Sequence, residues 1–496
     1  MMETTLNQTS LENHFQSFRK GIVGQDATFV SPYGSKKIIY ADWTASGRLY
    51  KPIEEKISHD IGPFVANTHT EITFTGSTIT NAYHKAHQII KDHVNASDED
   101  VILTGGSGMT GAVNKLHRIL GLRVPERFQD QVNIEAADRP IVFVTHMEHH
   151  SNHTSWLETI ADVECIVPDE DGRIDLAYLD NLLVKYQERK LKIASVTACS
   201  NVTGIRTCYP DVARLMHRHG GLCFVDFACS APYDEIDMHP QGPEEALDAI
   251  YFSPHKFLGG PGSSGVLIFH SSLYHNKTPD NPGGGTVNWT NPWGGRQYID
   301  DIATREDGGT PAFLQTIKVA LAIKLKEEMG VRNIQEREDE LVKLVFDKLR
   351  NLSGLHLLAE HREDRLGVFS FNIDGMHHDL VCQILNDRFG IQTRSGCSCA
   401  GTYGHYLLHI SKQKSREIID ELEHDHYLKK PGWVRMSIHP TMTDDEINFI
   451  LDSIIEIVEH VEEMSKDYTY VPDLNKFVHN TSNVDSISPL IEDWFG

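Results

Sequence analysis

The middle of the chain contains the stretch Asp248-Ala-Ile-Tyr-Phe-Ser-Pro-His-Lys-Phe-Leu-Gly-Gly-Pro-Gly-Ser-Ser-Gly265. Its apolar start predicts a short strand that leads into Ser253, His255 and Lys256, and a glycine-rich turn follows. A lysine at the end of a strand suits attack on a carbonyl group, because partial burial lowers the pKa of its amine. By itself the stretch favours a solvated loop lysine, so the assignment depends on the rest of the chain.

The composition indicates a folded protein. Of the 496 residues, 40% are hydrophobic and 23% charged, which excludes a mainly disordered or fibrous chain. The length suits two or three domains, or one large α/β domain with a smaller companion. The formal net charge of -24 argues against nucleic acid as a partner, because phosphate binding needs clustered lysine and arginine.

The sequence also predicts where the protein works. We find no apolar run long enough to span a bilayer, and the N-terminus lacks the basic and apolar parts of a signal peptide. The eight cysteines are scattered and do not form a disulfide framework, so we expect free thiols. A cytoplasmic protein without a membrane partner follows from these observations.

Strand and helix signals alternate between about residues 100 and 270, which is typical of an α/β fold with a mostly parallel sheet covered by helices. Strands are expected over 101–104, 141–145, 163–167, 193–198, 222–225, 249–252 and 265–269. Such sheets bind ligands beyond the carboxyl ends of their strands, and the chemically capable residues of this chain gather there.

The remaining segments suggest four parts. We expect an N-terminal arm over 1–35, a large domain over 36–315, a smaller α+β domain over 316–466 that takes in part of the N-terminal segment, and a polar tail over 467–496. Helices are expected over 11–22, 51–62, 77–94, 112–120, 312–329, 333–349, 378–389 and 444–465. A short strand is expected over 37–42, and residues 277–312 are predicted to form a loop because they are rich in Gly, Pro, Asn and Trp.

A glycine-rich turn, Gly105-Gly-Ser-Gly-Met-Thr-Gly111, joins the strand 101–104 to the helix 112–120. The start of a helix presents unpaired N–H groups and the positive end of its dipole, so this turn can hold a phosphate. A simple tight turn explains the glycines equally well. The spacing matches neither a Walker A loop nor the dinucleotide-binding glycine pattern.

Two further strand ends carry groups suited to a flat, charged ligand. Asp226 ends the strand 222–225 and could pair with a protonated ring nitrogen, although an aspartate that caps the next helix is the competing account. Four histidines occur in His146-Met-Glu-His-His-Ser-Asn-His153, and their spacing invites a metal interpretation. We expect no metal here because no complementary pair of ligands is evident, and His149 is better placed to stack on a cofactor ring.

A phosphate-binding turn, a strand-end aspartate and a strand-end lysine, in this order, describe a site for pyridoxal 5′-phosphate. With these features the chain resembles the class V aminotransferase family of pyridoxal-phosphate enzymes. Within that family it is similar to cysteine desulfurases and selenocysteine lyases, which carry the motifs Met-Glu-His-His (147–150 here) and Arg-x-Gly-x-x-Cys (394–399 here). The resemblance covers about residues 37 to 460. It implies the type I fold of pyridoxal-phosphate enzymes, with a large domain around a seven-stranded, mostly parallel sheet and a smaller α+β C-terminal domain.

The resemblance also implies a role for individual residues. Lys256 corresponds to the lysine that joins the cofactor, Asp226 to the partner of its ring nitrogen, and His149 to the stacking histidine. Asn201 corresponds to the asparagine near the phenolic oxygen and the substrate. The residues that correspond to phosphate ligands are Met109, Thr110, Ser253, His255 and Thr310. Thr310 belongs to a segment, Glu306-Asp-Gly-Gly-Thr-Pro311, that the family donates to the neighbouring subunit, so a homodimer with shared sites is implied.

The segment Gly390-Ile-Gln-Thr-Arg-Ser-Gly-Cys-Ser-Cys-Ala400 resembles the family's loop for substrate and sulfur. Arg394 corresponds to the arginine that binds the substrate carboxylate, and Cys399 to the sulfur-accepting nucleophile. Such a thiol has a lowered pKa next to an arginine and a helix start, although a cysteine can also be a small buried hydrophobe. Cys397 is an additional thiol that either resolves a persulfide or has no role.

Two positions depart from the family pattern. The family's Asp-x-Ala-Gln is Asp226-Phe-Ala-Cys229 here, so the glutamine that donates to the phenolic oxygen is missing. Gly401-Thr-Tyr-Gly-His405 replaces the usual residues after the nucleophile, which puts the substrate and the sulfur acceptor in doubt.

The main functional hypothesis is a pyridoxal-phosphate-dependent C–S lyase that acts on L-cysteine or an analogue. Lys256 moves the α-carbon proton, with His149 beside it. Cys399 takes the sulfur as a persulfide, alanine is released, and a protein is a possible sulfur acceptor. An aminotransferase, epimerase or β-lyase in which Cys399 is only structural is the first alternative. A non-catalytic regulator or scaffold is the second.

Overall fold

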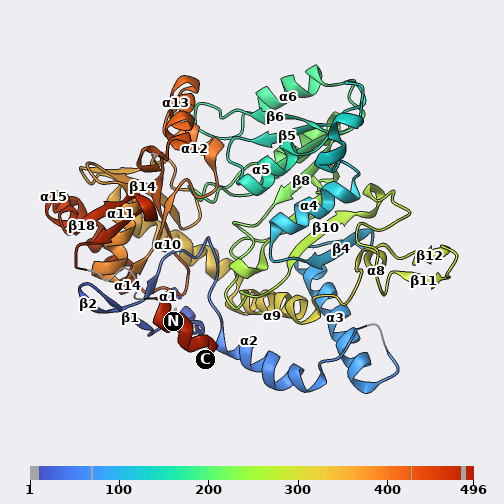
Figure 1. The fold of residues 1–496 in the computed structure, drawn as a ribbon, viewed down its shortest axis with the longest axis horizontal. Coiled ribbons are helices and arrows are strands. Elements are labelled where there is room, and N and C mark those ends of the chain that lie inside the picture. Colours follow the sequence, from blue (N-terminus) through green and yellow to red (C-terminus); the bar gives the residue numbers. More distant parts are fainter. Residues whose placement is uncertain (1–9, 69–70, 426, 482–486) are drawn as a thin grey trace, which may run out of the picture.

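The computed structural model describes residues 10–68, 71–425, 427–481 and 487–496, and its largest layer is a seven-stranded sheet (Figure 1). The strand order is β4-β10-β9-β8-β7-β5-β6. The strands are β4 (Asp100–Gly105), β5 (Ile141–Thr145), β6 (Asp162–Ile166), β7 (Lys192–Thr197), β8 (Leu222–Asp226), β9 (Ala249–Phe252) and β10 (Gly265–His270). Neighbours from β6 to β9 pair in parallel, and β10 runs antiparallel to β4 and β9. The predicted mostly parallel α/β sheet is confirmed.

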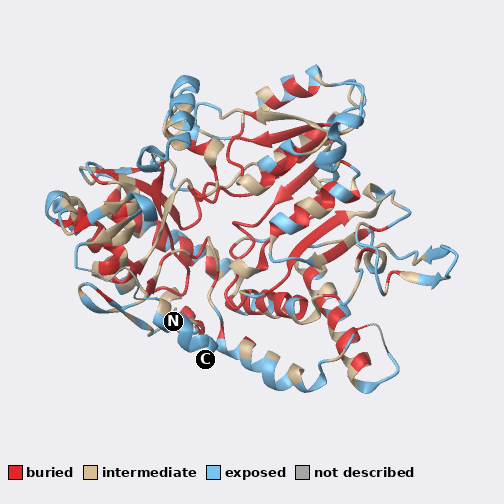
Figure 2. Cartoon of the chain, viewed as in Figure 1, coloured by how far each residue is buried: buried red, intermediate tan, exposed pale blue. Residues whose placement is uncertain are grey.

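Apolar side chains bury the inner strands on both faces. Every residue of β5, β7 and β9 is buried, as Figure 2 shows for the centre of the sheet. Successive side chains of a strand point to opposite faces. Phe143 accordingly packs with Val225 on one face, whereas Val142 and Val144 pack with Phe224 on the other.

Helices cover each face of this sheet. The face of Val142 is covered by α4 (Met109–Ile119) and α5 (His150–Leu157), which supply Leu116 and Trp156 to the core. The face of Phe143 is covered by α3 (Phe74–His93), α6 (Leu176–Lys185), α7 (Tyr209–Arg218) and α9 (Phe313–Met329). Within the described residues, every helix is too short or too polar to cross a lipid bilayer.

A smaller α+β unit is built on a second, antiparallel sheet with the strand order β13-β14-β17-β16. Its elements are the strands β13 (Leu355–Leu357), β14 (Val368–Ile373), β16 (Arg394–Gly396) and β17 (Trp433–Ser437), and the helices α10 (Val331–Leu349), α11 (His378–Ile384) and α14 (Asp444–Glu459). N-terminal residues join its core: Phe15 from α1 (Leu11–Arg19), Ile39 and Trp43. The strand β3 (Ile39–Tyr40) also pairs with β15 (Ile391–Gln392). The expected smaller α+β unit is therefore confirmed.

Several segments differ from the prediction. Residues 277–312, expected to be a loop, contain the hairpin β11 (Val287–Thr290) and β12 (Arg296–Tyr298) and the helix α8 (Ile302–Glu306). The tail contains the hairpin β18 (Tyr468–Val471) and β19 (Lys476–His479) and the helix α16 (Ser488–Phe495). The elements β11, β12 and α16 are largely exposed and the others are mostly half-buried, so no clear apolar period marks them. The single helix expected over 444–465 is divided in two: α14 ends at Glu459, and α15 (Val461–Ser465) follows it. Residues 1–9 of the expected arm lie outside the described residues.

Candidate functional site

The carboxyl ends of β7, β8 and β9 border a cavity of about 210 Å³. The predicted site residues that line it are Met109, Thr110, His149, Asn201, Asp226, Ser253, His255, Lys256 and Arg394. They come from segments as far apart in sequence as the start of α4 and the strand β16. The fold thus brings together residues that the sequence could only relate by motif.

Lys256 lies at the end of a one-turn 3-10 helix, Pro254–Lys256, directly after the fully buried strand β9. The turn is closely packed, since a Cβ atom at Gly260 would lie 1.9 Å from the carbonyl oxygen of Pro254. Burial lowers the pKa of the Lys256 amine, against the opposing charges of Cys229 and Asp226. No hydrogen-bond partner of this amine is found in the part of the chain that the structure describes. The amine is therefore poised for proton transfer or attack on a carbonyl carbon.

Asp226 ends β8 with its side chain in the cavity and is 3% exposed. Its Oδ1 atom accepts a hydrogen bond from the Ala228 amide at 2.8 Å. Burial raises the pKa of the carboxyl group to about 6, although this amide and the charge of Lys256 oppose the shift. Residues 228–233 form turns, so the alternative in which Asp226 caps a following helix is wrong. A buried carboxylate of this kind is suited to bind a cation in the cavity.

The start of α4 and the turn after β9 form a cradle for an anion. The Met109 amide donates a hydrogen bond to Ser253 Oγ at 2.9 Å, and Gly108 supplies no side-chain cap to the helix. A Cβ atom at Gly108 would lie 3.0 Å from Ser253 Oγ, so a side chain at this position would crowd the cradle. His255 also lines the cavity, and burial lowers the pKa of its ring to about 4. Helix-start amides and hydroxyl groups in this arrangement can hold a phosphate.

His149 is the N-cap residue of α5, where its Nδ1 atom accepts a hydrogen bond from the Ser151 amide at 3.1 Å. Burial lowers the pKa of its ring. The other histidines of the cluster have partners of their own. His146 pairs with the Gly172 carbonyl, His150 accepts from the Gly401 amide, and His153 pairs with the Thr402 hydroxyl. Of the four histidines, only His149 lines this cavity.

Cys399 lies beside Arg394 and His149. Its Sγ atom is 3.5 Å from Nη2 of Arg394, and its carbonyl oxygen accepts a hydrogen bond from the His150 amide at 2.7 Å. A hydrogen bond with His149 and the charges of His149 and Arg394 lower the pKa of the thiol to about 7, against the effect of burial. The backbone is left-handed at Ser398 (φ 50°) and Cys399 (φ 58°), which is strained for residues with a side chain. The loop therefore presents an activated thiol in a fixed geometry.

The two cysteines of this loop have different surroundings. Cys397 packs against a cluster that contains Met147, Val202 and Trp433, whereas Cys399 contacts Arg394 and His149, which line the cavity. Asn201 also fixes the loop, since its Nδ2 atom donates a hydrogen bond to the Ser398 carbonyl at 2.8 Å. The geometry favours Cys399 over Cys397 as the reactive thiol.

The pH dependence of Cys399 alkylation follows from these contacts. In a Cys397→Ser background, we expect the rate of iodoacetamide modification of Cys399 to rise with pH and to level off above a midpoint near pH 7. Replacing His149 by Asn removes the largest cause of the lowered pKa and moves the midpoint up, towards about 8.5. His153→Asn is the matched control, and an equal shift in that variant would contradict the assignment.

Sequence reasoning missed several residues that line the cavity. The most important is Arg435 of β17, which is 1% exposed and pairs with Asp42 at 2.6 Å. It also donates a hydrogen bond to the Asn201 carbonyl at 3.2 Å. The feature of the sequence that could have revealed this role is an arginine between the apolar residues of the strand Trp433–Ser437. Together with Arg394 it places two guanidinium groups at the cavity, an arrangement that suits a carboxylate.

Thr310 is not brought to this cavity. It lies in a second cavity, of about 400 Å³, which is also lined by Thr104, Lys115 and Arg118. The structure of one chain therefore leaves the predicted phosphate contact of Thr310 untested, because that contact was expected in a neighbouring subunit.

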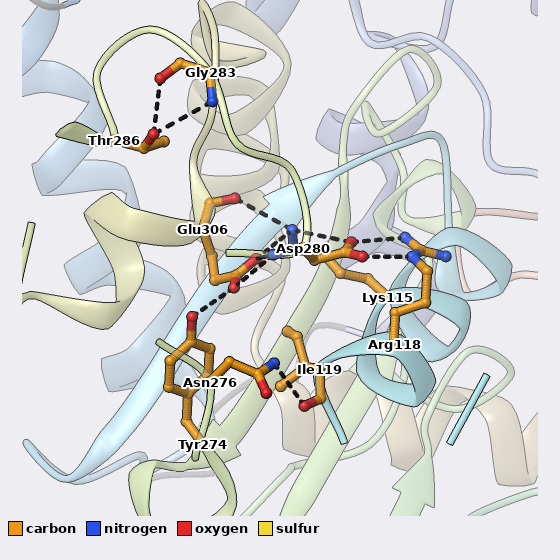
Figure 3. Close-up of polar contacts among 9 residues, drawn as sticks. All are labelled: Lys115, Arg118, Ile119, Tyr274, Asn276, Asp280, Gly283, Thr286 and Glu306. Atoms are coloured by element: carbon orange, nitrogen blue, oxygen red, sulfur yellow. Dashed lines mark hydrogen bonds and ion pairs between the residues drawn. The ribbon is translucent and has the colours of Figure 1, made fainter. Parts of the chain in front are cut away.

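A polar network around the buried Glu306 fixes the segment that carries Thr310 (Figure 3). The carboxylate of Glu306 accepts hydrogen bonds from Lys115 Nζ at 3.0 Å, the Tyr274 hydroxyl at 2.7 Å and the Asp280 amide at 3.0 Å. Asp280 in turn accepts two hydrogen bonds from Arg118, at 2.8 and 3.0 Å. Because Lys115 and Arg118 belong to α4, the network ties this segment to the helix that begins at the anion cradle.

Comparison with known proteins identifies the family. The sequence profile described as Aminotransferase class-V matches residues 39–450, so the chain belongs to this family of pyridoxal-phosphate enzymes. A protein of Staphylococcus epidermidis named "Probable cysteine desulfurase" is 28% identical over 374 residues, which cover 74% of this chain and 84% of that protein. One of the same name from Halalkalibacterium halodurans is 28% identical over 368 residues, 73% of this chain and 84% of that protein. The family resemblance noted from the motifs is confirmed.

Solved structures show the same fold. The apo cysteine desulfurase of Thermococcus onnurineus superposes with a TM-score of 0.70 at 23% identity, over 89% of this chain and 98% of that one. A cysteine desulfurase of Escherichia coli gives a TM-score of 0.68 at 21% identity, over 90% of this chain and 98% of that one.

Proposed function

We propose that the chain is a pyridoxal-phosphate-dependent C–S lyase that removes sulfur from L-cysteine or a close analogue and releases alanine. The observation that carries this proposal is that Lys256 and Asp226 face one cavity, while the activated Cys399 thiol contacts Arg394 and His149 of the same lining. The relatives named as probable cysteine desulfurases support the choice of substrate.

The cavity fits the cofactor. Glycine at position 108 leaves the anion cradle free of a side chain, and the buried Asp226 needs a cation that a protonated pyridine nitrogen provides. Burial lowers the pKa of the Lys256 amine, which favours the neutral form that an aldehyde requires. The residues that would hold the group are Met109, Thr110, Ser253 and His255 at the phosphate, Asp226 at the ring nitrogen, His149 at the ring face, Asn201 at the phenolic oxygen and Lys256 at the aldehyde carbon. When bound, the cofactor supplies an electron sink for bond cleavage at the substrate.

The chain's own residues perform the remaining tasks. Arg394 and Arg435 bind the substrate carboxylate and orient the α-carbon. Lys256 Nζ removes the α-carbon proton and later returns a proton to the product. The Cys399 thiolate attacks the substrate sulfur, the bond from that sulfur to the β-carbon breaks, and a persulfide stays on Cys399.

The test of this proposal is product analysis. The enzyme loaded with pyridoxal phosphate is incubated with L-cysteine, and alanine, sulfide and pyruvate are quantified in the presence of dithiothreitol. We expect equal amounts of alanine and sulfide, and a persulfide on the Cys399 peptide when the reductant is omitted. Pyruvate in place of alanine would instead indicate a β-lyase.

A substitution at Asp226 separates stability from cofactor binding. The folded-state pKa is raised from 3.8 to about 6, so ionisation of this group costs the cofactor-free fold about 3 kcal/mol above pH 6. We expect Asp226→Asn to raise the free energy of unfolding of the cofactor-free protein at pH 8 by up to that amount, and to weaken cofactor binding. The gain fades as the pH falls from 6 towards 3.8, because the wild-type carboxyl then becomes neutral as well. Urea unfolding of the wild type and of the variant at pH 8 and pH 4.5 measures this difference in the free energy of unfolding. An equal gain in stability at the two pH values would contradict the assignment.

We further propose a homodimer in which each subunit's Thr310 reaches the phosphate of its partner. Its support is the rigid anchoring of the Thr310 segment away from its own cavity.

A protein thiol is the proposed sulfur acceptor. The free state of the cysteines supports a reducing location such as the cytoplasm.

A further inference from the structure

Two thiols that the proposed reaction does not use lie at the ends of neighbouring parallel strands. Cys199 follows β7 and Cys229 follows β8, and Thr197 pairs with Asp226 in the register of these strands. Both cysteines line the active-site cavity, and they are 1% and 5% exposed. Cys229 occupies the position at which the family pattern has glutamine.

The two sulfur atoms meet at one backbone group. The Sγ atoms of Cys199 and Cys229 lie 3.7 and 3.6 Å from the carbonyl oxygen of Ser200. Cys199 Sγ is also 3.2 Å from the Gly204 carbonyl oxygen. The two thiols also form a hydrogen bond with each other, so their sulfur atoms are in contact and a small rotation of the side chains can bring them into the range of a disulfide.

The surroundings give the two thiols different reactivity. A hydrogen bond with Cys199, followed by the charges of Lys256 and Arg435, lowers the pKa of Cys229. Burial raises the pKa of Cys199 well above its usual range. Cys229 therefore has the larger thiolate fraction, which is the form that attacks an oxidant.

We propose that Cys199 and Cys229 are a second reactive thiol site, which a hydroperoxide oxidises to a disulfide between the ends of β7 and β8. The Cys229 thiolate attacks one peroxide oxygen, the O–O bond breaks, and a sulfenic acid and water (with hydrogen peroxide as the oxidant) form. The Cys199 thiol then attacks this sulfur, the S–O bond breaks, and a second water leaves as the S–S bond forms. The two thiols lose two electrons and two protons in total, and the peroxide is reduced. A thiol reductant reverses the change by disulfide exchange.

Peptide mapping of the full-length, cofactor-loaded enzyme tests the proposal. A Cys399→Ala background removes the activated thiol of the loop, and the protein is treated with hydrogen peroxide and then blocked and digested with trypsin. Cys199 lies in the tryptic peptide 193–206, and Cys229 lies in the peptide 219–256, which also contains Cys223. We expect a cross-linked pair of these two peptides that disappears after treatment with dithiothreitol.

Single substitutions assign the bond. Cys199→Ser and Cys229→Ser each abolish the cross-link, whereas Cys223→Ala keeps it, because Cys223 lies inside β8 and does not line the cavity. Two results would overturn the proposal: a cross-link that persists in Cys229→Ser, or peroxide treatment that oxidises Cys399 in the unsubstituted enzyme while no cross-link forms. The readout does not require activity, so it is independent of the proposed desulfurase function.

Discussion

Replacement of Lys256 by Ala is expected to lower alanine formation from L-cysteine by about 10³-fold or more, because the variant loses both the proton-transfer group and the cofactor attachment point. The amine is buried without a hydrogen-bond partner in the described part of the chain, and burial lowers its pKa. Among the described residues, no other lysine lines the cavity to replace it. The visible absorption of the cofactor joined to the protein is expected to disappear together with the activity.

Two controls make this result specific. Lys256→Arg keeps a positive charge but has no neutral amine at working pH, so it is expected to be as inactive as Lys256→Ala. Lys185→Ala removes an exposed lysine on the far end of α6 and is expected to keep full activity. Activity within tenfold of the wild type in Lys256→Ala would refute the assigned role.

Replacement of Cys399 by Ser is expected to lower alanine and sulfide formation by about 10²-fold or more, because a hydroxyl group is a poor sulfur acceptor near neutral pH. Binding of L-cysteine is expected to persist, since Arg394 and Arg435 stay in place. The variant thus separates substrate binding, measured by the spectral change of the cofactor, from C–S bond cleavage, measured by alanine.

Cys397→Ser is the matched control in the same loop. Its side chain packs against the apolar cluster of Met147, Val202 and Trp433, whereas the Cys399 thiol contacts Arg394 and His149. We expect it to retain turnover within a few-fold of the wild type. Full turnover in Cys399→Ser would instead support a transferase or β-lyase for which this cysteine is only structural.

The strands of the large sheet were predictable because burial on both faces requires continuous apolar runs. The sequence of β5, Ile141–Thr145, is such a run, and all of its residues are buried. The hairpin of β11 and β12 was not predictable in this way. It is mostly exposed and is closed by the side chain of Asn291, whose Oδ1 atom accepts hydrogen bonds from the amides of Trp293 and Gly295. The periodicity of apolar residues carries no signal for an element of this kind.

The site was predictable where a residue type marks a strand end, as for Asp226 and Lys256. It was not predictable where the role depends on which way a side chain faces. Arg435 is hidden in an apolar strand, and only the tertiary fold places it beside Arg394. The separation of Cys397 from Cys399 likewise depends on the left-handed backbone at residues 398 and 399, which neighbouring segments impose.

The pair Cys199 and Cys229 illustrates the same limit. The cysteines are thirty positions apart, and although the sequence marks Cys229 as a departure from the family pattern, nothing in it relates this residue to Cys199. Parallel pairing of β7 with β8 brings them to one carbonyl group. Cys229 is thus a thiol neighbour of Cys199 at the wall of the cavity.

The central claim is that one amine, Lys256, joins the cofactor in a cavity where Asp226 faces its ring nitrogen. The most direct measurement is borohydride reduction of the protein loaded with pyridoxal phosphate, followed by peptide mapping. We expect the added mass on Lys256 alone, and a lower yield at equal cofactor concentration in Asp226→Asn. Attachment at another lysine, or no attachment at saturating cofactor, would contradict the account.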